Sequence, residues 1–350
     1  MKRVAVIGTV GIPACYGGFE TLVENLTQYS SSDIEYYVFC SSDTYSEKLK
    51  THNGAKLIYI PLKANGFQSI LYDIYSMIYC LFLRPDSVLI LGVSGCLFLP
   101  VFKFFSKSKI ITNIDGLEWK RDKWANWAKN FLKWSEAIAV RFSNTIVTDN
   151  KAIGDYVENE YARESITIAY GGDHALCDED FPTSKECYAL GVCRVEPENN
   201  VHLILEAFEN IDKKIKFVGN WQSSHFGKTL KKKYSGFPNI DLIDPIYELD
   251  QLYRLRRGCS FYVHGHSAGG TNPSLVEMMH FGVPIFAFDC SFNRYSTEDK
   301  AMYFSNSTEL RKLIFDTKEE MLNNNGSAML EIANRRYTWR EISRLYESVY

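Results

Sequence analysis

The sequence lacks the features that mark disulfide scaffolds, zinc sites and nucleic-acid binders. Its nine cysteines are an odd number and form no C-x-x-C pair, so neither a disulfide framework nor a cysteine zinc site is expected. The net charge is only −3, from 39 Lys and Arg against 42 Asp and Glu, which argues against a nucleic-acid partner. Repeats and low-complexity segments are absent as well, while 46% of the residues are hydrophobic. These properties predict a globular, cytoplasmic chain.

Long apolar runs are also missing. Residues 88–102 carry no charge, but two glycines and a proline interrupt them, and a helix that spans a bilayer needs roughly 20 apolar residues. We therefore expect a buried strand followed by a core helix. Residues 1–8, which are apolar after Lys2 and Arg3, are interpreted as a first strand, because polar residues and glycines follow before a leader could form.

Short apolar runs alternate with segments of helical periodicity along the chain. The strand-like runs fall at residues 4–7, 36–40, 57–60, 88–91, 109–112, 145–148, 188–191, 215–218, 240–243, 261–263 and 284–287. Because helices separate them, we expect parallel sheets in α/β domains of the doubly wound, Rossmann-like type. A chain of 350 residues exceeds the usual size of one core, so two such domains are expected.

The domain boundary is predicted where this alternation breaks, after Gly171 and Gly172. The expected organisation is a first domain, a linker, a second domain and a final helix, at residues 1–172, 173–185, 186–336 and 337–350. Ligands of open α/β sheets bind beyond the carboxyl ends of the strands. Two such domains are therefore expected to bind their ligands in a common cleft.

A glycine-rich loop joins the first predicted strand to the first predicted helix. Residues 8–21 read G-T-V-G-I-P-A-C-Y-G-G-F-E-T, which matches neither the dinucleotide fingerprint nor a P-loop. Gly17 and Gly18, just before a helix, can present backbone N–H groups to an anionic or hydroxyl-rich ligand. The alternative is a turn that requires positive φ at its glycines. We prefer the binding interpretation, and the identity of the ligand stays open.

The second half carries a comparable loop at residues 264–279, which read H-G-H-S-A-G-G-T-N-P-S-L-V-E-M-M. Asn272 is suited to cap a helix that has proline in its first position, and a diphosphate would fit above such a helix start. Glu277, about one turn further, could accept hydrogen bonds from sugar hydroxyls. His264 and His266 are interpreted as polar residues that close a strand, in preference to a zinc pair, because no third ligand has suitable spacing.

Charged residues follow two other predicted strands. Arg194 follows the run 188–191 and could form a charge-assisted fork with a phosphate. Asp115 and Glu118 could act as an acid or base or could hold sugar hydroxyls; a structural turn is the competing interpretation. The D-x-D at residues 178–180, a spelling found in metal-dependent nucleotide-sugar enzymes, falls in the linker and is interpreted as solvated charge. No metal site is therefore expected.

Basic and aromatic residues gather at residues 103–134. This stretch has eight Lys or Arg against three acids, and it holds four of the six tryptophans. Cations beside amphipathic aromatic rings are typical of proteins that bind an anionic membrane surface. A buried aromatic helix with a solvated basic face explains the pattern equally well, so both interpretations stay open.

Four motifs in order along the chain, at residues 11–21, 61–69, 115–119 and 269–275, resemble bacterial rhamnosyltransferases of capsule and cell-wall polysaccharide synthesis. These enzymes belong to the retaining GT-B glycosyltransferases of family 4, and the resemblance covers nearly the whole chain. It implies the GT-B fold: two Rossmann-like domains facing across a cleft, the first for the acceptor and the second for a nucleotide sugar, with the final helix crossing back to the first domain.

The resemblance further implies the reaction. We expect transfer of L-rhamnose from dTDP-L-rhamnose to a polyprenyl-diphosphate-linked saccharide, with retention and without a metal or another cofactor. The product would enter a capsule, O-antigen or cell-wall polysaccharide, with the enzyme peripheral on the inner face of the plasma membrane. The alternatives are the same fold with a UDP- or GDP-hexose, and a non-catalytic subunit that binds nucleotide sugars.

The resemblance also assigns roles to residues. The expected catalytic residues are Asp115, Glu118 and Arg194. The expected donor-binding residues are Gly17, Gly18, Arg194, His266, Gly270, Thr271, Asn272, Ser274 and Glu277. The expected acceptor-binding residues are Tyr16, Lys63, Asn65 and Trp119. Gly269 stands where the group has the first glutamate of a pair, and Asn199 where it has a lysine. These departures are expected to increase the dependence of donor binding on Arg194 and on backbone N–H groups.

Overall fold

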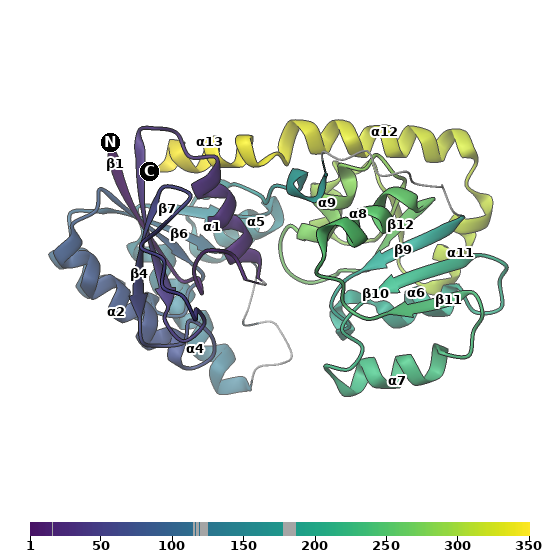
Figure 1. Ribbon diagram of the computed structural model, residues 1–350, viewed down its shortest axis with the longest axis horizontal. Helices are drawn as coiled ribbons and strands as arrows, with labels where there is room; N and C mark the ends of the chain where they lie inside the picture. The colour runs from purple at the N-terminus through teal and green to yellow at the C-terminus, as the bar shows by residue number, and fades with distance from the viewer. Residues whose placement is uncertain (16, 115, 117–118, 120–124, 178–186) are drawn as a thin grey trace. The chain divides into compact units, whose positions relative to one another are not determined.

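The chain folds into two compact units in the computed structural model (Figure 1). Unit 1 comprises Met1–Ala169 and Trp339–Tyr350, and unit 2 comprises Tyr170–Thr338. The structure describes all residues except 16, 115, 117–118, 120–124 and 178–186. Residues 173–177 of the predicted linker belong to unit 2, and residues 178–185 lie outside the described part.

Unit 1 is built on an eight-stranded sheet in the order β3-β4-β2-β1-β5-β6-β7-β8. Its strands are β1 (Lys2–Ile7), β2 (Ile34–Ser41), β3 (Thr51–His52), β4 (Ala55–Ile60), β5 (Ser87–Leu91), β6 (Lys109–Ile114), β7 (Thr145–Thr148) and β8 (Ile166–Thr167). All neighbours are parallel except β3 and β4, which form an antiparallel hairpin. The six predicted strands of this half are confirmed, and β3 and β8 are two-residue additions at the edges.

Helices cover both faces of this sheet. They are α1 (Gly18–Gln28), α2 (Gln68–Leu83), α3 (Leu99–Phe105), which continues a 3₁₀ turn η1 (Cys96–Phe98), α4 (Asn126–Phe142), α5 (Lys151–Tyr161) and α13 (Trp339–Val349). One core cluster joins Ala5 and Ile7 of β1 to Tyr72 and Met77 of α2, and it includes side chains of α3 and α4. Since side chains alternate along a strand, α2, α3 and α4 cover one face. The strand and core helix predicted for residues 88–102 are confirmed as β5 and α3.

The final helix, α13, belongs to unit 1, as the GT-B resemblance implied. Its Tyr346 Oη accepts a 2.7 Å hydrogen bond from Nδ2 of Asn113 in β6. Tyr350 lies edge-on to Tyr36 of β2, and their hydroxyls are 3.1 Å apart. Ile110 of β6 faces the α2 side, so Asn113, an odd number of residues away, faces the other side. α13 therefore covers the face opposite to α2.

Unit 2 is a six-stranded parallel sheet in the order β11-β10-β9-β12-β13-β14. Its strands are β9 (Tyr188–Val192), β10 (Lys214–Val218), β11 (Ile240–Ile243), β12 (Phe261–His264), β13 (Ile285–Phe288) and β14 (Met302–Phe304). Its α-helices are α6 (Val201–Ala207), α7 (His225–Tyr234), α8 (Leu249–Gly258), α9 (Pro273–Met279), α10 (Ser291–Ser296), α11 (Ser307–Asp316) and α12 (Glu319–Arg336), with 3₁₀ turns η3 (Asp173–Ala175) and η4 (Pro197–Asn199).

The predicted strands of the second half are also confirmed, and β14 is an edge strand that the pattern missed. Trp221 and Phe217 lie in the core of this unit, beneath α6 and α11. No helix in the described part of the chain is long and apolar enough to span a bilayer. The two doubly wound sheets place the loops after their strands at a carboxyl edge, where ligands of such folds bind.

Candidate functional site

The carboxyl edge of the unit 2 sheet carries Arg194, in the loop that follows β9. Its side chain is 44% exposed, and its Nη1 lies 3.8 Å from Oε1 of Glu196, which is too long for a good hydrogen bond. An exposed guanidinium with only a loose partner can donate two parallel hydrogen bonds to a phosphate.

Asn199 ties the Arg194 loop to the loop that follows β12. Its Nδ2 donates a 2.7 Å hydrogen bond to the carbonyl of Arg194, and its Oδ1 lies 2.7 Å from Nδ1 of His266. Because an amide oxygen only accepts, this His266 nitrogen carries the proton. Asn199 is almost fully buried. Asn199, at the position where the resemblance implies a lysine, is therefore a brace between two loops.

Two further asparagines hold the same loops. Nδ2 of Asn200 donates to the carbonyl of Gly265 at 2.9 Å, and Oδ1 of Asn220 accepts from the N–H of Val195 at 2.6 Å. A Cβ on Gly265 would lie 2.2 Å from the carbonyl oxygen of Asn199. The backbones of the two loops thus approach so closely that only glycine fits at this position.

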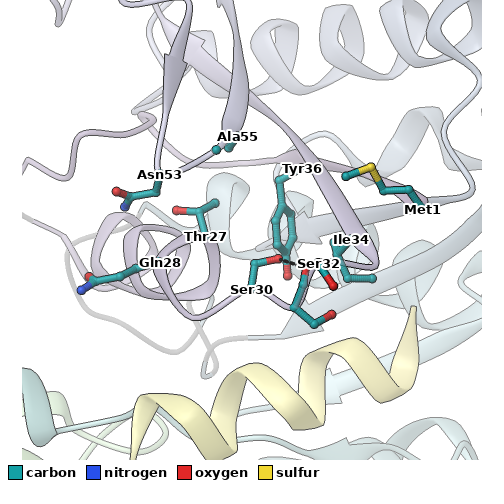
Figure 2. A pocket seen from close by; sticks show the side chains of 11 residues that line it. Met1, Thr27, Gln28, Ser30, Ser32, Ile34, Tyr36, Asn53 and Ala55 are labelled. Atoms are coloured by element: carbon teal, nitrogen blue, oxygen red, sulfur yellow. Dashed lines mark hydrogen bonds between the residues drawn. The ribbon is translucent and has the colours of Figure 1, made fainter.

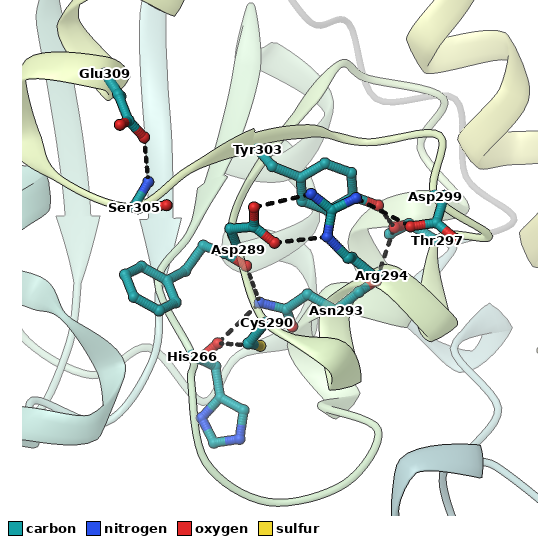
Figure 3. Close-up of polar contacts among 11 residues, drawn as sticks. His266, Asp289, Cys290, Asn293, Arg294, Thr297, Asp299, Tyr303, Ser305 and Glu309 are labelled. Atoms are coloured by element: carbon teal, nitrogen blue, oxygen red, sulfur yellow. Dashed lines mark hydrogen bonds and ion pairs between the residues drawn. The ribbon is translucent and has the colours of Figure 1, made fainter.

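Asn293, at the start of α10, extends the network to the loop after β13 (Figure 3). Its Nδ2 donates to the carbonyls of His266 and Phe288, both at 2.8 Å. Beside it, Arg294 forms a bidentate pair with Asp289 at 2.6 and 2.8 Å. The hydrogen bonds from Arg294 hold the pKa of Asp289 below its usual range. The loops after β9, β10, β12 and β13 therefore form one braced surface around Arg194 and His266.

α9 begins as the sequence predicted. Oδ1 of Asn272 accepts a 3.0 Å hydrogen bond from the N–H of Ser274, and Pro273 is the first helical residue. Gly270 and Thr271, just before it, are buried. Gly269 has φ +120°, a conformation that side chains rarely adopt. This backbone disfavours the glutamate that the resemblance implies at this position.

Glu277 of α9 forms an ion pair with the buried Arg256 of α8, and its Oε1 lies 3.4 Å from Nε2 of His174. Burial by itself would raise the pKa of Glu277, but Arg256 and His174 outweigh burial and hold this pKa below its usual range. Glu277 is therefore a carboxylate, and 13% of its side chain is exposed. It can accept hydrogen bonds from hydroxyl groups of a ligand.

His264 is the last residue of β12 and is almost fully buried, so it closes the strand as expected. Burial lowers the pKa of His264 well below its usual value, and His266 lowers it further, which keeps the ring neutral. Among the residues that the structure describes, no three His, Cys, Asp or Glu side chains converge as metal ligands would.

The glycine-rich loop of unit 1 is organised differently. Glu20 of α1 is buried beneath this loop, and its Oε1 accepts hydrogen bonds from the N–H of Val10 at 2.8 Å and the hydroxyl of Thr9 at 3.0 Å. Glu24, one turn later, accepts from the N–H of Ala14 at 2.8 Å. A Cβ on Gly17 would lie 1.8 Å from Oε2 of Glu20. Two backbone N–H groups of the loop thus already bind carboxylates of the helix itself.

Comparison with known proteins divides the chain in the same way. Residues 179–341 match the family model of glycosyl transferases group 1, and residues 1–173 match a domain of unknown function (DUF1972). Among curated proteins no match is found. A sucrose-phosphate synthase from Thermosynechococcus elongatus superimposes with a TM-score of 0.80 at 11% identity, over 100% of this chain and 98% of the other. The chain is a GT-B glycosyltransferase.

Two other solved structures are similar to this GT-B glycosyltransferase. HepE from Anabaena, in complex with UDP, gives a TM-score of 0.75 at 12% identity, with 99% of each chain covered. The catalytic domain of starch synthase IV from Arabidopsis thaliana, bound to ADP and acarbose, gives 0.74 at 12% identity, over 99% of this chain and 98% of the other. At such identities the likeness establishes the fold.

The remaining predicted site residues of the glycosyltransferase fall in unit 1. Tyr16, Asp115 and Glu118 lie outside the described residues. Lys63 and Asn65 are exposed in the loop after β4. The ring of Trp119 packs under the ammonium of Lys133, 4.6 Å from the ring centre, and beside Tyr156 of α5.

A surface cavity of unit 1, about 300 Å³ in volume, lies away from these residues (Figure 2). Its lining includes Ile34 and Ala55, which begin β2 and β4, together with Gln28 at the end of α1. It therefore lies at the amino edge of the sheet, whereas ligands of such folds bind at the carboxyl edge. None of the predicted site residues lines it.

Sequence reasoning missed several residues that shape the unit 2 edge. They are His174, Asn220, Arg256 and Asn293. The asparagines do carry a signal, since each follows a predicted strand within a few residues, where a loop at the carboxyl edge is expected. The Arg256–Glu277 pair joins two helices across a strand, and no spacing rule identifies such a partner.

Proposed function

We propose that this glycosyltransferase moves L-rhamnose from dTDP-L-rhamnose to a polyprenyl-diphosphate-linked saccharide, in the synthesis of a bacterial surface polysaccharide such as a capsule, O-antigen or cell-wall polymer. The four ordered motifs that resemble rhamnosyltransferases support the sugar and the acceptor. The group 1 domain supports a nucleotide-sugar donor. The reaction would need no metal ion and no cofactor besides the donor.

The observation that carries the proposed donor site is the braced carboxyl edge of unit 2. Arg194 is exposed there, and the asparagine network fixes the loop backbones around it. We assign the donor diphosphate to Arg194, His266 and the residues that lead into α9, namely Gly270, Thr271, Asn272 and Ser274. A rigid set of donors stabilises a developing negative charge without reorganisation. Glu277, held as a carboxylate by Arg256, would accept hydrogen bonds from the ribose hydroxyls.

In the proposed reaction the bond between the sugar and the diphosphate breaks while Arg194 stabilises the departing phosphate. Transfer with retention on one face lets the acceptor hydroxyl give its proton to that leaving phosphate, so no strong side-chain base is required. Asp115 and Glu118 would orient the acceptor, with Tyr16, Lys63, Asn65 and Trp119 as further acceptor contacts. Gly17 and Gly18 would approach the donor through their backbone.

A panel of nucleotide sugars tests the donor, with product formation and anomeric configuration followed by NMR. The proposal expects turnover with dTDP-L-rhamnose and a retained configuration, and EDTA should leave the rate unchanged. A UDP-hexose is the second candidate, because the similar HepE was solved with UDP-glucose at a TM-score of 0.73. Turnover with a UDP-hexose alone would replace rhamnose. Saturable binding without turnover of any donor would instead indicate a non-catalytic subunit.

Arg194→Ala tests the phosphate assignment. Loss of one charge-assisted contact to the phosphate should lower kcat/KM by roughly 10- to 100-fold. Arg335→Ala is the matched control, because Arg335 is an exposed arginine on α12 whose partners are Glu298 and Glu331. Full activity of a folded Arg194→Ala variant would overturn the assignment.

A further inference from the structure

The outer face of α2 is apolar, which is unusual for a surface helix. Its Leu71, Tyr75, Ile78 and Phe82 are exposed, with Phe82 82% exposed. They recur at intervals of three and four residues, so they form one stripe along the helix. The only charged residue of α2, Asp73, is buried on the opposite side.

The inner face of α2 shows why this arrangement is stable. Oδ2 of the Asp73 carboxyl group accepts a 3.0 Å hydrogen bond from the N–H of Gly95. Ser69 and Ser76 donate to backbone carbonyls of Gly66 and Tyr72 at 2.6 and 2.8 Å. Most of these polar groups are thus hydrogen-bonded inside, although Oδ1 of Asp73 is buried without a partner, and the sequence leaves the apolar side chains outside. This is the reverse of a helix that faces water.

Neighbouring helices extend the apolar stripe. On α3, Val101, Phe104 and Phe105 are exposed, with Phe104 83% exposed. At the start of α2, Phe67 stacks on Trp127 of α4 with 5.2 Å between ring centres, and both rings are exposed. α3 packs against both α2 and α4. We call the exposed side chains of this layer the α2–α4 surface: Phe67, Leu71, Tyr75, Ile78, Phe82, Val101, Phe104, Phe105, Trp127 and Trp134.

The charge of this layer has one sign. Within residues 66–85, 99–109 and 125–142, all of which the structure describes, the only acids are Asp73 and Glu136, and both are buried. Arg84, Lys103, Lys107 and Arg141 are exposed in the same ranges. Within these ranges the exposed charges are therefore all positive, and two neighbouring acids that the structure describes, Asp86 and Glu160, bind the N–H of Arg3 and the ammonium of Lys133.

We propose that the α2–α4 surface docks on an anionic phospholipid bilayer. Exposed aromatic rings beside cations, without acids, complement the headgroup region of such a membrane. A second copy of the chain would bring like charges together, which disfavours a symmetric interface. α2, with 16 residues, is about 24 Å long and has a packed inner face, so it would lie in the interface.

This inference deepens the proposed function, because a polyprenyl-linked acceptor resides in a bilayer. The sequence pattern alone indicates residues 103–134 as a candidate membrane-binding segment. The folded surface differs from that segment, because its main apolar stripe comes from α2, which lies outside residues 103–134. Two of the described cations of the stretch also hold the fold: Nζ of Lys103 donates to the carbonyl of Phe142 at 2.7 Å, and Lys133 pairs with Glu160 at 2.7 Å.

Co-sedimentation with phosphatidylcholine vesicles, with and without phosphatidylglycerol, tests the docking. The wild-type chain should bind the anionic vesicles, and salt should weaken the binding. The triple variant Leu71→Gln, Tyr75→Gln, Phe82→Gln should reduce partitioning by roughly tenfold or more, because three apolar groups no longer enter the interface. Lys107→Gln with Arg141→Gln should reduce only the preference for anionic over neutral vesicles.

The matched control is Phe315→Gln with Met321→Gln, two equally exposed apolar side chains of unit 2, and it should bind vesicles as the wild type does. A second measurement keeps the test valid if the triple variant misfolds. Brominated lipid should quench the tryptophan fluorescence of the wild type, and Trp127→Phe with Trp134→Phe should reduce this quenching, since both rings are exposed on the α2–α4 surface.

Three results would overturn the proposal: absence of vesicle binding, unchanged binding of the folded triple variant, or loss of a dimer in the triple variant without any vesicle binding. Donor turnover with a water-soluble acceptor separates this test from the proposed function. The triple variant should keep that turnover. Vesicle binding without turnover of any donor would count against the function only, and turnover without vesicle binding would count against the docking only.

Discussion

The two sheets brace their carboxyl-edge loops with different side chains. In unit 1, Glu20 and Asp73 accept hydrogen bonds from neutral backbone N–H groups of the loops after β1 and β5. In unit 2, asparagines make the corresponding contacts, and the carboxylates of Glu277 and Asp289 lie against arginines. At the first edge a negatively charged ligand would meet the carboxylate of Glu20, which is bound by neutral groups, whereas burial raises the pKa of Asp73 and favours its neutral form. At the second edge the ligand would meet carboxylates that arginines compensate. The comparison supports placing a diphosphate at unit 2 and an uncharged part of an acceptor at unit 1.

The largest change in stability is expected when Glu277 of unit 2 loses the arginine that compensates its charge. Arg256→Met leaves the buried Glu277 without its main cation, which should destabilise unit 2 by about 3–5 kcal/mol. Urea unfolding measures this change. Arg257→Met, at the exposed neighbour on α8, should change stability by less than about 0.5 kcal/mol. Equal effects of the two variants would show that the pair does not compensate Glu277.

The unit 1 edge should respond to pH through Asp73. Burial raises the pKa of Asp73 to about 8, against the hydrogen bond from Gly95, which lowers it. The folded chain therefore keeps a proton that the unfolded chain releases in the ordinary Asp range, so stability should fall as the pH rises towards 8, by at most about 1.4 kcal/mol per pH unit. Asp73→Asn should remove this slope in urea unfolding. An unchanged slope would mean that Asp73 is ionised in the folded chain.

Substitutions of Glu20 test the difference between the two edges through both protein stability and donor binding. Glu20→Ala leaves the buried N–H of Val10 unsatisfied and should cost about 1–3 kcal/mol, while Glu20→Gln keeps an acceptor oxygen and should cost less. If the donor diphosphate binds at unit 2, so that Gly17 and Gly18 meet only an uncharged part of the donor, Glu20→Gln should leave the donor KM unchanged or lower it. A clear rise in KM for a stable Glu20→Gln variant would place the donor against this carboxylate.

The last test concerns the loop before α9. Gly269→Glu places at φ +120° the glutamate that the resemblance implies, and backbone strain should cost about 1–3 kcal/mol. Gly236→Glu is the control, because nothing lies within 4 Å of its added Cβ. Thermal unfolding compares the two. A neutral Gly269→Glu would mean that the loop can adopt the backbone of its relatives.

The strands, the final helix and the cap of α9 could be predicted from the sequence because each depends on local pattern. Residues 145–148 and the Asn272 cap are examples, since alternation and capping chemistry act within a few residues. The braces could not be predicted, because Asn199 and His266 meet only after β9 and β12 pair. The outer face of α2 had a readable signal: Ser69, Asp73 and Ser76 share one side of the helix, which indicates that the polar side is buried.

The return of α13 to unit 1 makes unit 2 an insertion within unit 1. The hydrogen-bond partners of Asn113 and Tyr36 are Tyr346 and Tyr350, about 230 to 315 residues further along the chain. Unit 1 therefore completes its packing only after the final helix has been synthesised. Unit 2 has no such dependence, since its strands and core residues come from one continuous segment. On the ribosome the second unit can therefore fold before the first is complete.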